Sequence, residues 1–155
     1  MEQRINFQEK GQKAIKAMYG LSGYLAKSQV ERRLLNLIYL RVSQINGCAF
    51  CLDMHSKDLR AEGETEQRLY LLNAWREAPF YSDRERAALA YAEAVTVLKD
   101  REVTDEVFDA VNAQFTDEEI IDLTLAITTI NSYNRFNIAF RTEAGSYEPG
   151  QFAPH

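Results

Sequence analysis

Proline and long apolar segments are scarce in this sequence. Only three of the 155 residues are proline, and two of them stand at positions 149 and 154, so little interrupts helix formation before the C-terminal end. No run reaches the roughly 18 apolar residues of a membrane-spanning helix. The N-terminal segment MEQRINFQEKGQK is charged where a secretory signal has an apolar core. We therefore expect a cytoplasmic protein with no membrane partner.

Positive charge is also in short supply. Lys and Arg number 18 against 23 Asp and Glu, which gives a formal net charge of −5 at pH 7, and the basic residues are scattered along the chain. Binding to a nucleic-acid backbone depends mainly on clustered Lys and Arg. This composition therefore excludes a general nucleic-acid partner. Hydrophobic residues make up 46% of the chain, which is enough for one compact core at this length.

Several motifs of known chemistry are missing. The sequence contains no GxGxxG, P-loop, GxSxG or HExxH pattern. These patterns are typical of dinucleotide-binding, NTP-binding, hydrolase and metalloprotease sites. We therefore expect no bound cofactor, and any chemistry should come from the side chains of the protein itself.

Helical signals, in contrast, are plentiful. Three segments, beginning at Ser28, Ser82 and Thr116, match the capping box, in which a hydroxyl side chain and a carboxylate three residues later satisfy free N–H groups at a helix start. Apolar residues recur at helical spacing, and no alternation typical of strands is present. The predicted helices cover about residues 7–19, 31–44, 48–63, 66–75, 83–98, 105–113 and 117–140.

These segments predict an all-α bundle of about six to seven helices. We assign residues 1–142 to a single helical domain and residues 143–155 to an extended or poorly ordered C-terminal tail. The first helix should loosen at its end, at Gly20 and Gly23. The last helix, 117–140, is apolar on nearly every side, which indicates burial within the bundle or at a subunit interface.

Both cysteines and one of the two histidines stand in the short segment INGCAFCLDMHSKDLRAEG. Its Asn-Gly pair is a strong helix stop, so the next helix should open at or near Cys48. On that helix Cys48, Cys51 and His55 share one face, because they are three and four residues apart. A disulfide can then span a single helical turn. The segment therefore predicts a redox-active CxxC pair at the start of a central helix.

Two physical effects favour different cysteines as the reactive one. The positive end of the helix dipole stabilises a thiolate nearest the helix start, which favours Cys48. His55 stands one turn after Cys51 and can take a proton from that thiol directly or through one water, which favours Cys51. The residues alone leave the assignment open.

Two other interpretations of this segment are weaker. The cysteines could pack as inert buried residues, but their position directly after a helix stop and before a histidine argues against this. A structural zinc site needs four ligands, usually as two separated pairs, and the second pair is missing. The only other histidine, His155, ends the tail. We therefore predict no metal at Cys48, Cys51 and His55.

The segment LRVSQINGCAFCLDMHSKDLRAEG, together with WREAPFYSDRERAALAYAEA and INSYNRFNIAFR, resembles the alkylhydroperoxidase AhpD-like proteins of the carboxymuconolactone decarboxylase superfamily. The resemblance spans about residues 30 to 142. It implies an AhpD-like, all-helical fold that assembles into homo-oligomers, commonly trimers or hexamers.

The resemblance also implies a role for each residue of the motif. Carried over position by position, Cys51 is the nucleophile that attacks a hydroperoxide, Cys48 resolves the sulfenic acid as a disulfide, and His55 belongs to the proton relay. An external dithiol reductant, which for AhpD is a lipoylated protein, would return the disulfide to the dithiol.

The chain departs from the AhpD pattern at two positions. AhpD has a glutamate twelve residues before the first cysteine, and Asn36 stands there in this sequence. An amide does not accept a proton at neutral pH, so the relay either runs through His55 and water or uses another carboxylate. The second departure is Phe50, where AhpD has a second histidine. Both changes remove titratable groups.

The sequence therefore predicts a thiol-dependent peroxidase or disulfide reductase that uses a CxxC dithiol activated by histidine. One alternative is a non-enzymatic redox-sensing or assembly module, in which the disulfide changes packing between subunits. The other is a lactone decarboxylase, but that chemistry has no use for a redox dithiol.

Overall fold

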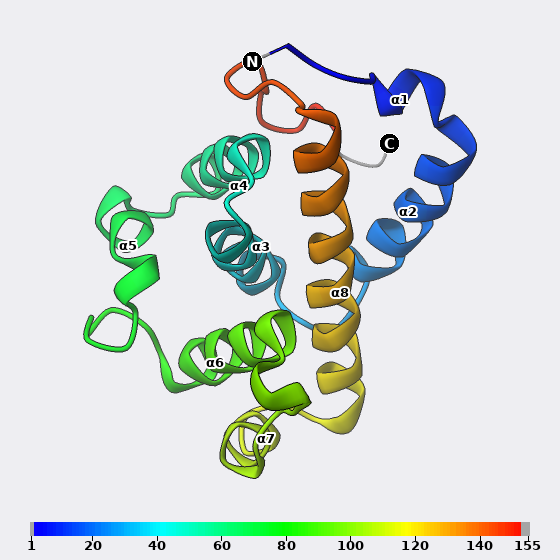
Figure 1. Ribbon diagram of the computed structural model, residues 1–155. Coiled ribbons are helices and arrows are strands. Elements are labelled where there is room, and N and C mark those ends of the chain that lie inside the picture. Colours follow the sequence, from blue (N-terminus) through cyan, green and yellow to red (C-terminus); the bar gives the residue numbers. More distant parts are fainter. Residues whose placement is uncertain (1, 153–155) are drawn as a thin grey trace.

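The computed structural model describes residues 2–152, and every regular element in that range is helical. The elements are α1 (Phe7–Lys10), α2 (Gln12–Leu25), α3 (Arg32–Asn46), α4 (Ala49–Ala61), α5 (Glu66–Tyr70), η1 (Leu72–Ala74), α6 (Asp83–Val97), η2 (Lys99–Arg101), α7 (Asp105–Asn112) and α8 (Asp117–Phe140), η1 and η2 being short 3₁₀ helices. This confirms the all-α prediction (Figure 1). Within residues 2–152, no helix is both long and apolar enough to span a membrane.

The first predicted helix, residues 7–19, differs from the observed structure. Gly11 separates α1 from α2, and α2 continues to Leu25. The prediction that Gly20 and Gly23 loosen the helix was wrong. Their helix is anchored by Ile15 and Leu25, which are buried, and it packs against α8. This burial outweighs the cost of roughly 1 kcal/mol for each glycine inside a helix.

Two of the three predicted capping boxes are present, at the starts of α6 and α8. The third prediction was wrong, because α3 begins at Arg32 and neither Ser28 nor Glu31 caps it with a side chain. The Glu31 carboxylate instead accepts hydrogen bonds from Arg84 at 2.9 and 3.1 Å. This ion pair ties the start of α3 to α6, an interaction between distant segments that a local pattern cannot reveal.

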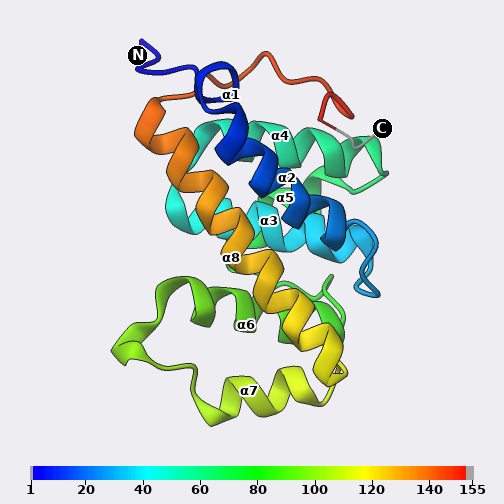
Figure 2. The ribbon, with the colours of Figure 1, turned by 90° about the vertical axis from the view of Figure 1, so that its right-hand side faces the viewer.

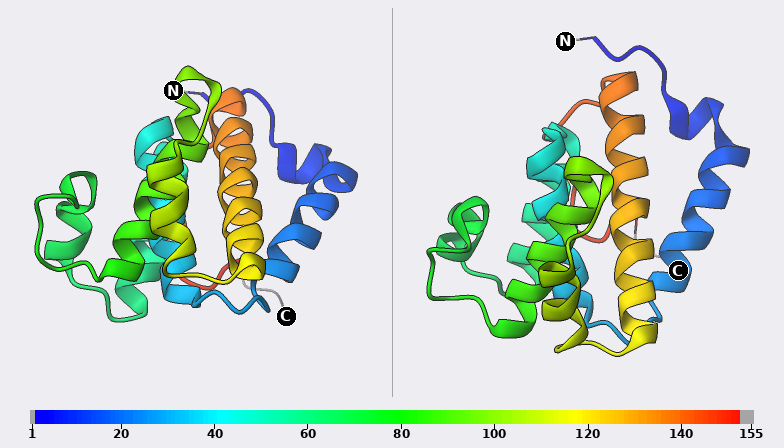
Figure 3. Two further views of the ribbon diagram at one scale, coloured as in Figure 1. Left: turned by 90° about the horizontal axis from the view of Figure 1, so that it is seen from below. Right: turned by 60° about the horizontal axis from the view of Figure 1, so that its bottom comes forward.

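Helix α8 runs through the middle of the molecule, with α3, α4 and α6 on one side and α1 and α2 on the other (Figures 1 and 3). Figure 2 views the molecule from the side of α1 and α2, which lie in front of α3 and α4. Leu123, Ala126 and Ile127 are fully buried, as the apolar sequence of this helix predicted. Ile121 and Ile138 nevertheless remain 68% and 46% exposed. The helix is thus central in the fold, with apolar side chains left at the surface near both ends.

The described part of the C-terminal tail, residues 143–152, forms no regular element and lies against α4. The Lys57 ammonium donates hydrogen bonds to the carbonyls of Gly145 and Tyr147 at 3.1 and 2.9 Å. Tyr147 is only 3% exposed, and its hydroxyl donates to Asp58 at 2.7 Å. One buried aromatic side chain and several hydrogen bonds therefore fix an irregular segment to the bundle.

Candidate redox site

The backbone between α3 and α4 folds as the sequence predicts. Gly47 adopts the left-handed conformation with φ of 68° and ends α3, a geometry that other residues adopt only with strain. Its N–H and that of Cys48 donate to the carbonyls of Gln44 and Ser43. Cys48 is the N-cap of α4, which confirms that the motif opens this helix.

Cys48 and Cys51 form a disulfide across the first turn of α4, with their Cα atoms 5.3 Å apart. Both side chains are 1% exposed. The sulfur of Cys48 also accepts a hydrogen bond from the Cys51 N–H at 3.3 Å. The sulfur of Cys48 therefore acts as the N-cap acceptor of α4, a role that a side-chain oxygen usually has.

A cavity of about 410 Å³ lies beside the motif. Cys51, His55 and Asn36 all line it, whereas Cys48 does not. Its walls come from α1, α2, α3, α4, α8 and the tail, and they carry several aromatic side chains. The aromatic lining residues include Phe7, Tyr19, Tyr39, Phe50, Tyr133 and Phe152. The structure thus places one sulfur of the pair in contact with a ligand-sized space and keeps the other behind it.

His55 is 5% exposed, and neither of its ring nitrogens has a hydrogen-bond partner among the described residues. Its ring packs against that of Tyr39, with centroids 5.3 Å apart. Burial disfavours the charged imidazolium and lowers the pKa of His55 to about 4. At neutral pH the imidazole is therefore uncharged, and one of its nitrogens is available as a base beside Cys51.

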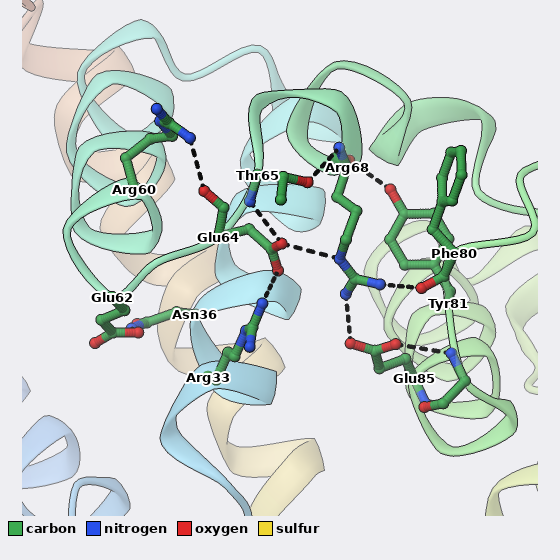
Figure 4. Close-up of polar contacts among 11 residues, drawn as sticks. Arg33, Asn36, Arg60, Glu62, Glu64, Thr65, Arg68, Phe80, Tyr81 and Glu85 are labelled. Atoms are coloured by element: carbon green, nitrogen blue, oxygen red, sulfur yellow. Dashed lines mark hydrogen bonds and ion pairs between the residues drawn. The ribbon is translucent and has the colours of Figure 1, made fainter.

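Asn36, the position where AhpD has a glutamate, has a carboxylate next to it. Its side-chain N–H group donates to both oxygens of Glu62 at 3.1 Å (Figure 4). Glu62 also pairs with Arg32 at 2.7 Å. Glu62 itself is not among the described residues that line the cavity. The amide thus connects the cavity wall to an ion pair at its edge.

A second carboxylate, Asp58, does line the cavity. It stands three residues after His55 and therefore on the same face of α4. Burial raises the pKa of Asp58, although the hydrogen bond from Tyr147 opposes that rise. Sequence analysis did not identify this residue. Its spacing of three residues from His55 could have indicated a shared helix face. The sequence does not show that this face lines a cavity, because segments distant in the chain form the other walls.

Asn137 on α8 was also missed. It is 6% exposed, lines the cavity, and donates one hydrogen bond to the sulfur of Cys51 at 3.6 Å and another to the Tyr133 carbonyl at 2.9 Å. The signal in the sequence was the regular spacing of Asn131, Asn134 and Asn137 within INSYNRFNIAFR. Three asparagines at helical spacing on an apolar helix need hydrogen-bond partners, which the sequence alone does not locate.

The other two asparagines of this series hold α8 against α3. Asn46, at the end of α3, donates to Asn131 at 2.9 Å and to Asn134 at 2.8 Å. Asn134 is fully buried and donates in turn to Ser43 at 3.0 Å. This network fixes the end of α3, and with it the start of α4, relative to α8.

No group of three or more His, Cys, Asp or Glu side chains within the described range could hold a metal ion. His155, the only other histidine, lies outside the described residues. Cys48, Cys51 and His55 offer thiol and acid–base side chains at this site.

Comparison with known proteins places these features in a family. Residues 10–94 match the model of the carboxymuconolactone decarboxylase family. The uncharacterised protein YdfG of Bacillus subtilis (strain 168) is 44% identical over 146 residues, which are 94% of this chain and 99% of YdfG.

Solved structures agree with this assignment. A protein of unknown function from Agrobacterium tumefaciens, provisionally assigned as the antioxidant defence protein AhpD, is 42% identical with a TM-score of 0.90, over 94% of this chain and 100% of that one. The debrominase Bmp8 shares the fold at 21% identity, with a TM-score of 0.75 over 89% of this chain and 74% of its own. The chain belongs to the carboxymuconolactone decarboxylase family and, within it, to the AhpD-like proteins.

Proposed function

We propose that this protein is a thiol-dependent peroxidase and disulfide reductase in which Cys51 is the nucleophile and Cys48 the resolving thiol. The AhpD-like fold and the CxxC disulfide support an antioxidant-related role. The observation that carries the finer assignment is that Cys51 lines the 410 Å³ cavity together with His55, whereas Cys48 does not. A substrate in the cavity meets the sulfur of Cys51 first.

The chemistry proceeds in three steps. The Cys51 thiolate attacks the terminal oxygen of a hydroperoxide, so that an S–O bond forms, the O–O bond breaks, and the released alkoxide takes a proton to become the alcohol. The Cys48 thiol then attacks the Cys51 sulfenic acid, releasing water and forming the disulfide. An external dithiol reduces the disulfide by thiol–disulfide exchange and is itself oxidised.

Neutral His55 is the base in the first step. Its lowered pKa keeps it uncharged at neutral pH, so a ring nitrogen is free to accept a proton. The negative charge that develops on Cys51 stabilises the imidazolium as the proton is transferred, and His55 then returns the proton to the alkoxide. Asp58 replaces the missing glutamate as the carboxylate of the relay, because it lines the same cavity one turn after His55. Since the two side chains share no hydrogen bond, a water in the cavity would link them. Asn36 then has a structural role, holding Glu62 at the edge of the cavity.

Cys48 suits the resolving role. The N–H of Cys51 donates to its sulfur at the start of α4, and such a contact stabilises a thiolate. A stabilised thiolate is a good leaving group when the reductant attacks the sulfur of Cys51. We further propose that the reductant is a lipoylated protein and that the chain acts in the cytoplasm as a homo-oligomer, a trimer or a hexamer.

The test is peroxide-dependent oxidation of dihydrolipoamide with tert-butyl hydroperoxide as substrate. Cys51→Ser should abolish turnover, because the nucleophile is lost. Cys48→Ser should also stop turnover but should accumulate one sulfenic acid at Cys51, captured by a dimedone-type trap and located by peptide mass spectrometry. Trapping on Cys48 in the Cys51→Ser protein would reverse the two roles, and full turnover in Cys51→Ser would reject the proposal.

A further inference from the structure

Three residues that line the cavity carry buried polar atoms with no partner among residues 2–152. These atoms are both ring nitrogens of His55, the hydroxyl of Thr129 and the side-chain oxygen of Asn137. Leaving a buried polar group unpaired costs about 1–3 kcal/mol. Their gathering around one cavity indicates a ligand with hydrogen-bonding groups.

Asn137 differs from the other two residues because it also touches the reactive sulfur. The Tyr133 carbonyl is an acceptor only, so the group that faces it at 2.9 Å must be the NH₂ of Asn137. This fixes the orientation of the amide. Its second N–H then points to the sulfur of Cys51, 3.6 Å away, and its Oδ1 is the atom left without a protein partner.

The positions of Asn137 and Cys51 are set by the fold. Asn137 lies three residues after Asn134, whose buried hydrogen bond to Ser43 ties α8 to α3. The donor and the sulfur are thus held together from two helices, and both side chains are more than nine-tenths buried. A hydrogen bond to a charged acceptor in such a site is stronger than the same bond in water.

We propose that Asn137 is a catalytic residue that binds both reactants. Its Nδ2–H stabilises the Cys51 thiolate, and its Oδ1 accepts the O–H of the hydroperoxide, which aligns the O–O bond with the sulfur. In the attack the S–O bond forms, the O–O bond breaks, and the hydroperoxide O–H becomes the O–H of the sulfenic acid. The role of Oδ1 rests on the proposed function, whereas the role of Nδ2 concerns the thiol alone.

The role of Nδ2 is tested without peroxide, by the pH dependence of iodoacetamide alkylation of each cysteine in the reduced protein. Asn137→Leu, which keeps a similar volume, should raise the pKa of Cys51 by about one unit, so that its alkylation below that pKa slows about tenfold. The pKa of Cys48 should not rise, because Asn137 donates to the sulfur of Cys51 and less thiolate on Cys51 makes Cys48 no harder to ionise. Thr129→Val, an isosteric change in the same cavity wall, should leave both pKa values unchanged.

A second variant protects this test from a folding defect. Asn137→Asp replaces the donor by a carboxylate and should raise the pKa of Cys51 further than Asn137→Leu, because like charge opposes the thiolate. Thermal unfolding establishes that each variant is folded. An unchanged Cys51 pKa in either folded variant would overturn the proposed role of Nδ2.

The role of Oδ1 is tested above the pKa of Cys51, where the thiolate is fully formed in every variant. Asn137→Leu should then react with iodoacetamide as fast as the unmodified protein but with tert-butyl hydroperoxide about tenfold more slowly. If Asn137→Leu reacts as fast as the unmodified protein with both reagents, the proposed role of Oδ1 is overturned. If the pKa shift occurs but the unmodified protein turns over no hydroperoxide, the proposed function fails and the role of Nδ2 stands.

Discussion

Two polar clusters inside this helical bundle differ in how their groups are partnered. In the first, Glu64 is 1% exposed, and its carboxylate accepts from the Thr65 N–H at 2.9 Å and from Arg68 at 3.0 Å and pairs with Arg33 at 3.1 Å (Figure 4). In the second, around the cavity, His55 is also buried, at 5% exposed, and its ring nitrogens have no hydrogen-bond partner within the described chain.

The pKa values of Glu64 and His55 are both lowered, but the lower pKa keeps Glu64 charged and His55 uncharged at neutral pH. Burial alone would raise the pKa of Glu64, but the Thr65 N–H and the charges of Arg68 and Arg33 outweigh it and hold the carboxylate ionised. Burial lowers the pKa of His55, because no group in residues 2–152 compensates the charged form. A buried carboxylate that is paired with two arginines holds the structure together, whereas a buried imidazole with no partner among the described residues remains available for chemistry beside the cavity.

The largest effect should come from removing the base of the cavity. His55→Gln should lower the rate of hydroperoxide reduction by about 10²- to 10⁴-fold, the usual contribution of a general base. Stopped-flow oxidation of the reduced protein measures this rate. Glu64→Gln, in the partnered cluster, should leave the rate per folded molecule unchanged. Equal losses in the two variants would remove the functional distinction between the clusters.

Stability should respond in the opposite way. Glu64→Leu should lower the free energy of unfolding by roughly 3 kcal/mol, because it leaves Arg68 without one of its two carboxylate partners in a buried site. Urea denaturation measures the loss. Glu66→Gln is the matched control, since the pair of Glu66 with Arg60 is exposed and should contribute less than about 1 kcal/mol. Similar losses of unfolding free energy in Glu64→Leu and Glu66→Gln would show that burial does not determine how much these ion pairs stabilise the fold.

The unpartnered histidine should make stability depend on pH. The folded pKa of His55 is about 4 and the unfolded value is 6.5, so the unfolded chain binds more protons between these pH values. Its contribution to stability is full above pH 6.5 and is lost as pH falls towards 4, by roughly 3 kcal/mol. Urea denaturation of unmodified and His55→Gln protein at pH 7 and 4.5 isolates this part. If the stability of both proteins changes equally between pH 7 and 4.5, His55 is not held uncharged by burial in the folded protein.

The smallest effect should come from the tail. Tyr147→Phe removes the hydrogen bond to Asp58 and keeps the buried ring, so the free energy of unfolding should fall by about 1 kcal/mol. The same change should raise the pKa of Asp58, because this bond favours the carboxylate. Tyr70→Phe, at a side chain 72% exposed, is the control and should have no effect. A loss no larger than that of the control would mean that the tail does not hold Asp58.

The sequence predicted well where the physical cause is local. The ends of α3 and α4 follow from Gly47 and the residues beside it, and the register of Cys48, Cys51 and His55 follows from helix geometry. It failed where a distant segment intervened. Arg84 takes the Glu31 carboxylate that the capping pattern assigned to a helix start, and packing against α8 keeps Gly20 and Gly23 helical.

The helices, the CxxC pair and the histidine one turn after it depend on residues within a few positions of one another, so these features could be predicted from the sequence. Which sulfur lines the cavity, and which groups surround it, depends on how whole helices pack together. Asp58 joins the site through a cavity closed by the tail, and Asn137 comes to Cys51 from a helix 86 residues further along the chain. Such contacts arise from the packing of whole helices, which no short stretch of sequence encodes.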